Sequence, residues 1–256
     1  MQTMRCLGLL GGGDDGSVAV YERRIVAEIA HRFGIGHSAN RVSLNLAHAA
    51  LSAAIKERDW PAAGRLIRRG MEALGGLGAE AVVVCSNLLH PALERFESPL
   101  PVLSIADAVV PAVRVARKKQ VGVIGTVCDG EERFWRRQFA AAGTHAVFFP
   151  LPADRGHCAG VIAIERSQHI LNESSRDDLA RIVYGLRQAG AKALVVVAPG
   201  LAELLDSSES ILPIFDAADL HASAAVDWAI QRLPRPEAGR PRKIAIESRD
   251  TTSLAR

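Results

Sequence analysis

The feature that most constrains the fold of this chain is an internal repeat. The run 7–13 (LGLLGGG) matches 121–127 (VGVIGTV), and 78–85 (GAEAVVVC) matches 190–198 (GAKALVVVA). Each run holds a short, continuously apolar stretch that stops at glycine or small residues, which is typical of a buried parallel strand. We therefore predict an α/β protein with two pseudo-symmetric, doubly wound parallel-sheet (Rossmann-like) domains and the cleft between them.

The segments between these runs complete the pattern. Strands are expected near 4–10, 42–46, 79–85, 102–105, 120–126, 145–150, 190–198 and 211–215, and helices near 18–33, 48–57, 61–75, 91–96, 107–117, 129–142, 156–170, 174–189 and 219–232. Strands that alternate with helices indicate parallel sheets. From this order we expect residues 1–105 with 211–232 to form the first domain, 106–210 the second, and 233–256 a disordered basic tail.

The net charge of the chain is concentrated in this tail. The 256 residues carry a formal charge of +3, and the tail holds six Lys and Arg against three Asp and Glu, so the body is formally neutral. A neutral body argues against nucleic acid as the main partner. Apolar runs stay well short of the ~18 residues that a membrane span needs. The first residues lack a signal-peptide cleavage site, so we expect a cytoplasmic protein without a membrane partner.

Polar side chains follow the third predicted strand where it ends. Cys85, Ser86 and Asn87 come at the end of the apolar run, and His90 lies three residues further on. In open α/β sheets, ligands bind outside the carboxyl ends of the strands. We therefore expect the functional site of this chain at 85–90.

The positions of the glycines and cysteines exclude several kinds of binding motif. The glycine run 11–13 joins a strand to a helix and lets backbone N–H groups approach an anion, but it is neither a dinucleotide fingerprint nor a P-loop. The four cysteines include no CxxC pair, so zinc and redox motifs are unsupported and we expect no metal. Cys85 is expected as the buried last residue of its strand, and Cys128 follows a strand of the second half.

Taken together, the motifs resemble the aspartate/glutamate racemase family, especially its bacterial broad-specificity amino-acid racemase branch. The resemblance covers about residues 4–232 and is carried by Leu7–Gly12, His37–Ala39, Glu57–Trp60, Gly78–Glu80, Cys85–His90, Leu103–Asp107, Gly122–Thr126, Ile211–Asp216 and His221–Ala222. It implies two domains around one active site, no cofactor, a small-molecule substrate and, usually, a homodimer. In the family, one cysteine thiolate removes the α-proton and a second cysteine returns a proton to the opposite face.

The sequence departs from the family at both cysteine positions. Counted back from His90, the first position falls on Ser86, which becomes a candidate catalytic residue. The second falls on Ala198, or on Pro199 after a one-residue slip, and neither side chain can transfer a proton. Cys128 lies in the turn expected to face the cleft from the second half. It is therefore the candidate replacement thiol.

The resemblance also implies a set of substrate-binding residues around the strand ends. They are Gly12, Asp14, Asn87, Thr126, Asp129, His157 and Pro199. Asp14, Asp15 and Asp129 place negative charge where the family binds a dicarboxylate. A like-charge contact in a cleft costs on the order of 1 kcal/mol or more. We therefore expect acidic substrates to be disfavoured.

Three functions stay open on the sequence. The first is a racemase or isomerase with altered proton donors that acts on a small carboxylate-bearing molecule. The second is a catalytically inactive relative with a binding or regulatory role. The third is a decarboxylase, lyase or cyclase that uses the aspartates and His157 in the same cleft. The resemblance favours the first function, whereas the missing thiols argue for the other two. His90 and His221 are interpreted as structural residues.

Overall fold

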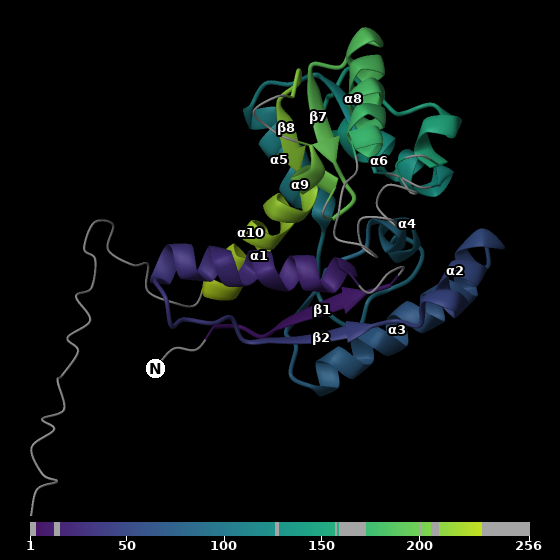
Figure 1. Cartoon of the computed structure of the whole chain (residues 1–256). Coiled ribbons are helices and arrows are strands. Elements are labelled where there is room, and N and C mark those ends of the chain that lie inside the picture. Colours follow the sequence, from purple (N-terminus) through teal and green to yellow (C-terminus); the bar gives the residue numbers. More distant parts are fainter. Residues whose placement is uncertain are drawn as a thin grey trace, which may run out of the picture.

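Two four-stranded parallel sheets form the core of the computed structural model, which describes residues 4–12, 16–125, 128–156, 158, 173–199, 201–205 and 210–231. The first sheet has the order β2 (Arg41–Asn45), β1 (Leu7–Gly11), β3 (Ala81–Val84) and β4 (Val102–Leu103). The second has the order β6 (Ala146–Phe148), β5 (Gln120–Ile124), β7 (Ala193–Val196) and β8 (Ile214–Asp216). Figure 1 shows the two sheets in separate domains. The predicted α/β class is confirmed.

The internal repeat reappears in the register of the strands. Leu7 lies opposite Ala81 in the first sheet, and Val121 lies opposite Ala193 in the second. The strand order is also the same in both sheets, because the first strand of each half pairs with the second and third strands and the fourth lies outside the third. The two halves, which are similar in sequence, therefore have the same sheet topology.

Helices cover both faces of each sheet. In the first domain, α1 (Gly16–Phe33) and α10 (Ala217–Ile230) lie on one face, and α2 (His48–Lys56) and α3 (Trp60–Gly76) on the other. In the second, α5 (Ile105–Val115) and α6 (Asp129–Ala141) lie on one face, and α8 (Glu173–Gln188) and α9 (Leu201–Leu204) on the other. Among the described residues, no helix is long and apolar enough to cross a membrane.

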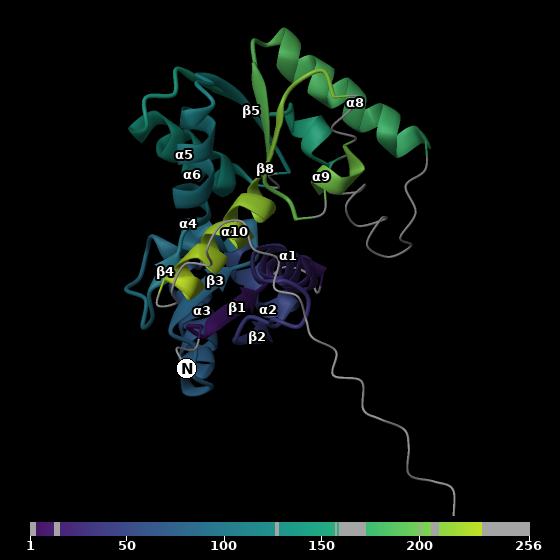
Figure 2. The ribbon, with the colours of Figure 1, turned by 90° about the vertical axis from the view of Figure 1, so that its left-hand side faces the viewer.

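Two helices cross from one domain to the other. Helix α5 follows β4 of the first sheet but packs on the second, and α10 follows β8 of the second sheet but packs on α1. Both views show α10 alongside α1 (Figure 2). Asp216 forms this junction, because it ends β8 and its Oδ1 accepts hydrogen bonds from the N–H groups of Ala218 at 2.9 Å and Asp219 at 3.3 Å.

Strand pairing corrects the domain boundary predicted at residue 211. We expected 211–232 in the first domain, but β8 pairs with β7 and belongs to the second sheet, so only α10 joins the first domain. The reason is that Ile214 and Phe215 alternate between the two apolar cores of the second domain. The predicted tail 233–256 and most of the predicted helix 156–170 lie outside the described residues.

The segment after β3 also differs from the prediction of a helix at 91–96. The chain forms a 3₁₀ turn, η1 (Asn87–Leu89), and then one short helix, α4 (His90–Leu93). The Leu89 N–H donates to the Ser86 carbonyl at 3.2 Å, so the turn starts directly at the strand end. This early turn keeps Ser86 and Asn87 at the carboxyl edge of the sheet.

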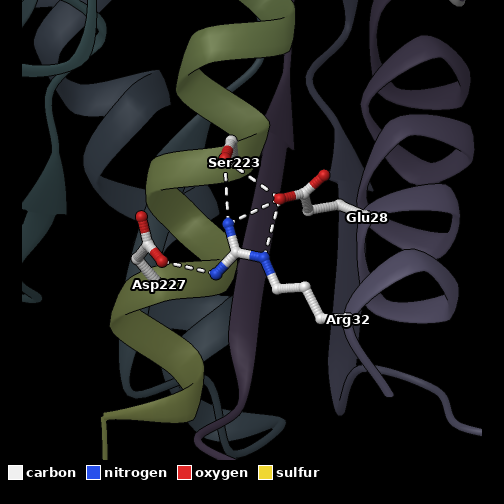
Figure 3. A network of polar contacts seen from close by, with 4 residues as sticks. All are labelled: Glu28, Arg32, Ser223 and Asp227. Carbon is white, nitrogen blue, oxygen red and sulfur yellow. Dashed lines mark hydrogen bonds and ion pairs between the residues drawn. The ribbon is translucent and has the colours of Figure 1, made fainter. Parts of the chain in front are cut away.

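A polar network fixes α10 against α1 (Figure 3). Arg32 donates through Nε to Glu28 Oε1 at 2.7 Å and through Nη2 to Ser223 Oγ at 3.0 Å, and it pairs with Asp227 through Nη1. Ser223 Oγ donates to Glu28 at 3.2 Å. The two helices are about 195 residues apart in sequence, so this network helps to hold the crossing helix in the first domain.

Candidate active site at the strand ends

The floor of the candidate site is closely packed around Gly12, which follows β1. This glycine is buried, and a Cβ atom there would lie 2.7 Å from Leu51 Cδ2 and 3.2 Å from Leu89 Cδ1. The neighbouring strand end is tied to it, because Cys85 N–H donates to the Leu10 carbonyl at 2.8 Å. A larger residue at position 12 would therefore require the Leu51 and Leu89 side chains to shift.

Asn87 links the two domains through its side-chain amide. Its Nδ2 donates to Glu131 Oε1, and its Oδ1 accepts from Trp135 Nε1 at 3.0 Å. Both partners lie on α6 of the second domain and are buried, as Asn87 itself is. Indole N–H is only a donor and carboxylate only an acceptor, so the amide has one possible orientation. We call these three residues the Asn87 bridge; the predicted substrate contact of Asn87 stays a prediction.

Cys128 is attached to the same carboxylate from the other side. It is the N-cap of α6, where its sulfur accepts from the Glu131 N–H while its own N–H donates to Glu131 Oε2 at 2.9 Å. Burial and the nearby Glu131 charge raise the pKa of the Cys128 thiol to about 11. Cys128 is therefore a neutral thiol at neutral pH, one carboxylate group away from Asn87.

Ser86, the candidate at the first cysteine position, is buried at the end of β3. Within the described part of the chain, no hydrogen bond from its hydroxyl to a neighbouring base is present. Cys85 points away from Ser86 into the core beneath α1 and α10, with Sγ 3.6 Å from the Val83 carbonyl. The predicted burial of Cys85 is confirmed, but β3 ends one residue earlier, at Val84.

The position predicted for the second cysteine holds apolar residues. Ala198 and Pro199 are buried after β7. Gly125, which follows β5, has φ +99°, and a Cβ atom there would lie 2.7 Å from Ala198 Cβ. This close approach requires glycine at 125 and a small residue at 198. The position that the resemblance assigns to the second thiol therefore holds a methyl group at Ala198 or, after a one-residue slip, the ring of Pro199.

The two histidines of the family motifs are buried. His221 donates through Nε2 to the Leu103 carbonyl at 2.8 Å and accepts from the Tyr21 hydroxyl at Nδ1 at 2.9 Å. His90 stacks on Phe134 with ring centroids 5.7 Å apart. Burial, with the His221 charge as a second cause, lowers the pKa of His90 to about 3, and burial lowers the pKa of His221 to about 4. Both rings are neutral at neutral pH.

The acidic residue predicted to repel dicarboxylates at the second strand end has a partner. Asp129 is largely exposed and pairs with Arg155 Nη1 at 3.1 Å, which also pairs with Glu132 at 2.9 Å. Asp14, Thr126 and His157 lie outside the described residues. In the described ranges, no three His, Cys, Asp or Glu side chains gather where they could hold a metal ion.

Sequence reasoning assigned neither Glu131 nor Trp135 to the site. Both belong to the site because they hold Asn87 across the domain boundary. One signal was present in the sequence, since Cys128-x-x-Glu131 has the spacing of a capping box at a helix start. The contact to Asn87 had no such signal, because it joins residues 44 and 48 positions apart.

The fold and the site define a class of protein in which two repeated α/β domains place their strand ends at one interdomain site. The model of the Asp/Glu/Hydantoin racemase family matches residues 9–225 of this chain. The chain belongs to this family. Its racemase-like function rests on this match and on racemase structures of the same fold.

Several solved structures resemble this one. A candidate Asp/Glu racemase from Yersinia pestis is 29% identical, with a TM-score of 0.76 over 89% of this chain and 100% of that chain. An aspartate racemase homologue from Pyrococcus horikoshii is 18% identical, with a TM-score of 0.73 over 88% and 99%. A glutamate racemase from Francisella tularensis, solved with D-glutamate, is 13% identical, with a TM-score of 0.63 over 88% and 81%. The latter two support the fold.

Proposed function

We propose that this protein is a cofactor-independent, racemase-like enzyme that binds a small carboxylate-bearing molecule and exchanges the proton on the carbon next to the carboxylate from one side only. The proposal is supported by Ala198, a buried residue just after β7 at the position that the family resemblance assigns to its second thiol. Inversion needs proton carriers on opposite faces of the substrate, whereas exchange needs one. Among the described residues of the site, we assign one side chain, Cys128, as a proton carrier.

We assign this exchange to Cys128. Its N–H and the Asn87 amide bind the same Glu131 carboxylate, which keeps the thiol beside the Ser86–Asn87 segment. The thiolate takes the α-proton, and the electron pair left on carbon spreads into the substrate carboxylate. The thiol then exchanges its proton with water and returns one to the same face. Because the pKa is about 11, roughly one thiol in 10⁴ is ionised at pH 7.

Deuterium exchange tests this assignment. The protein is incubated in D2O with the L and D forms of several amino acids, and loss of the α-proton signal is followed by NMR together with optical rotation. We expect exchange without inversion, and a rate that rises about tenfold per pH unit between about pH 7 and 10. Cys128→Ser should abolish exchange. Cys158→Ser is the matched control, because Cys158 is buried and burial raises its pKa to about 11 as well.

Two results would overturn the assignment. Racemisation of either enantiomer would show a second proton carrier. Exchange lost in Ser86→Ala but kept in Cys128→Ser would move the chemistry to the serine hydroxyl.

A second candidate function is ligand binding without catalysis. It is favoured by the Asn87 bridge, because the amide and the carboxylate are engaged between the domains, and by the neutral state of the Cys128 thiol. Thermal stabilisation by a small carboxylate without α-proton exchange at any pH would select this function.

The family resemblance supports three finer proposals. The protein forms a homodimer, which light scattering tests by a mass twice that of the chain. It acts in the cytoplasm. The ligand is held by the predicted residues Gly12, Asp14, Asn87, Thr126, Asp129, His157 and Pro199, which alanine or, at Gly12, serine substitution tests by ligand affinity.

A further inference from the structure

A cavity of about 540 Å³ lies where α1, β8, α9 and the start of α10 meet, away from the residues predicted for the active site. Its lining combines apolar residues, Ala202, Ile214, Phe215 and Leu220, with charged residues, Arg24, Asp216 and Asp219. Figure 2 shows α9 and β8 of the second domain next to α1 and α10. The volume is in the range of small-molecule sites, which combine apolar walls with a few polar groups.

Two of the charged groups neutralise each other. Arg24 Nη2 lies 2.6 Å from Asp216 Oδ2, and both side chains are largely buried, at 11% and 18% exposure. Asp216 is held further by the two N–H groups that it caps at the start of α10. This pair is therefore a fixed part of the cavity wall and leaves no net charge there.

Asp219 supplies an additional negative charge at the exposed rim. Within the described residues, its carboxylate makes no ion pair or side-chain hydrogen bond. Partial burial raises the pKa of this carboxyl, Arg24 acts against that shift, and Asp216 and Glu28 add to it. A nearby cation stabilises the charged form of a carboxyl group in such surroundings. The lining of the cavity as a whole thus combines apolar residues with a net charge of one negative unit.

We propose that this cavity binds a small apolar molecule that carries a protonated amine. The ammonium group lies against Asp219, and the apolar body lies against Ile214, Phe215 and Leu220. A free carboxylate on the ligand is disfavoured, because the cavity lining carries the two carboxylates of Asp216 and Asp219 against the single cation of Arg24. The site differs in ligand chemistry from the strand-end site, and it does not depend on the proton exchange proposed there.

The repeat supplies a matched control within the chain. Ser104 caps α5 as Asp216 caps α10, and the third residue of α5 is Asp107, the counterpart of Asp219. Asp107 is exposed on the opposite crossing helix and does not line the cavity. Asp107→Asn therefore removes a negative charge from the third residue of α5, whereas Asp219→Asn removes one from the third residue of α10.

Calorimetric titration with three probes of one shape tests the proposal: 2-phenylethylamine, 2-phenylethanol and phenylacetate. We expect the amine to bind at least about tenfold more tightly than the alcohol, and phenylacetate to bind most weakly. Asp219→Asn should reduce this preference for the amine to less than about threefold, whereas Asp107→Asn should leave it unchanged. Ala202→Trp fills the cavity from α9 and should remove binding of the amine and the alcohol while α-proton exchange persists.

Three outcomes would overturn the proposal. They are equal affinity for amine and alcohol, an amine preference that survives Asp219→Asn, and amine binding that survives Ala202→Trp. Failure of α-proton exchange in the wild-type chain would bear on the proposed function alone.

Discussion

Replacing Glu131 by glutamine isolates the electrostatic part of the site. The carboxylate accepts from Asn87 Nδ2 with one oxygen and from the Cys128 N–H with the other. Glutamine keeps the shape but offers one oxygen, so one buried donor loses its acceptor. An unsatisfied buried donor costs about 1–3 kcal/mol, and a chain of this size loses about 2–4 °C in Tm per kcal/mol. Glu131→Gln should therefore unfold several degrees below the wild type.

The same change should make Cys128 more reactive. A negative charge beside a thiol disfavours the thiolate, so removing it lowers the pKa of Cys128 from about 11. Burial is the larger cause of the raised value and remains, so the pKa should stay above its ordinary value of 9.0. Each unit of decrease multiplies the thiolate population tenfold, so we expect alkylation of Cys128 at pH 8.5 to rise by roughly 3- to 10-fold.

Alkylation with iodoacetamide, read by peptide mass spectrometry, measures this effect. The other cysteines, Cys6, Cys85 and Cys158, are buried, so the signal at Cys128 is separable. Glu132→Gln is the control, because that neighbouring carboxylate pairs with Arg155 and not with Cys128. A lower Tm in Glu131→Gln with unchanged or slower alkylation of Cys128 would refute the electrostatic argument.

Two further predictions concern stability. His90 and His221 are neutral when folded, with pKa values of about 3 and 4 against 6.5 for the free side chain. The unfolded chain therefore binds more protons below about pH 6.5, and urea unfolding should show stability falling by about 1–3 kcal/mol per pH unit from there down to about pH 4; a flat profile between pH 7 and 5 would contradict this. Gly125→Ala should cost about 1–3 kcal/mol through its positive φ and the clash with Ala198. Gly34→Ala, with φ +90° and open space around it, should cost less, and equal losses would exclude the clash.

The fold was largely predictable from the sequence because its signals are local. Short apolar runs that end at glycine or small polar residues mark parallel strands, and the match of 78–85 to 190–198 predicts that the pattern occurs twice. The boundary at 211 was not predictable, because nothing local distinguishes a strand that pairs within its own half from one that joins the other sheet. The pairing of β8 with β7 decided it.

The candidate site was predictable in part. The register of His90 placed Ser86 at a strand end, and the matching run placed Ala198 at the equivalent end of the other half. The use of Asn87 was not predictable. From the sequence we predicted that its amide contacts the substrate, but in the structure the amide forms hydrogen bonds with Glu131 and Trp135. Side-chain pairing between domains depends on how two separately folded units meet, which no local pattern records.

The sequence alone determined that this chain is a repeated α/β protein, and the family resemblance predicted that its second thiol position is occupied by a residue without a proton to transfer. Those conclusions rest on residue identity and on apolar periodicity, which do not depend on distant parts of the chain. The tertiary structure alone decided that β8 pairs with β7 in the second sheet and that Cys128 is held beside Asn87 by one buried carboxylate. Burial and charge set the ionisation of a group, and both are properties of the assembled fold.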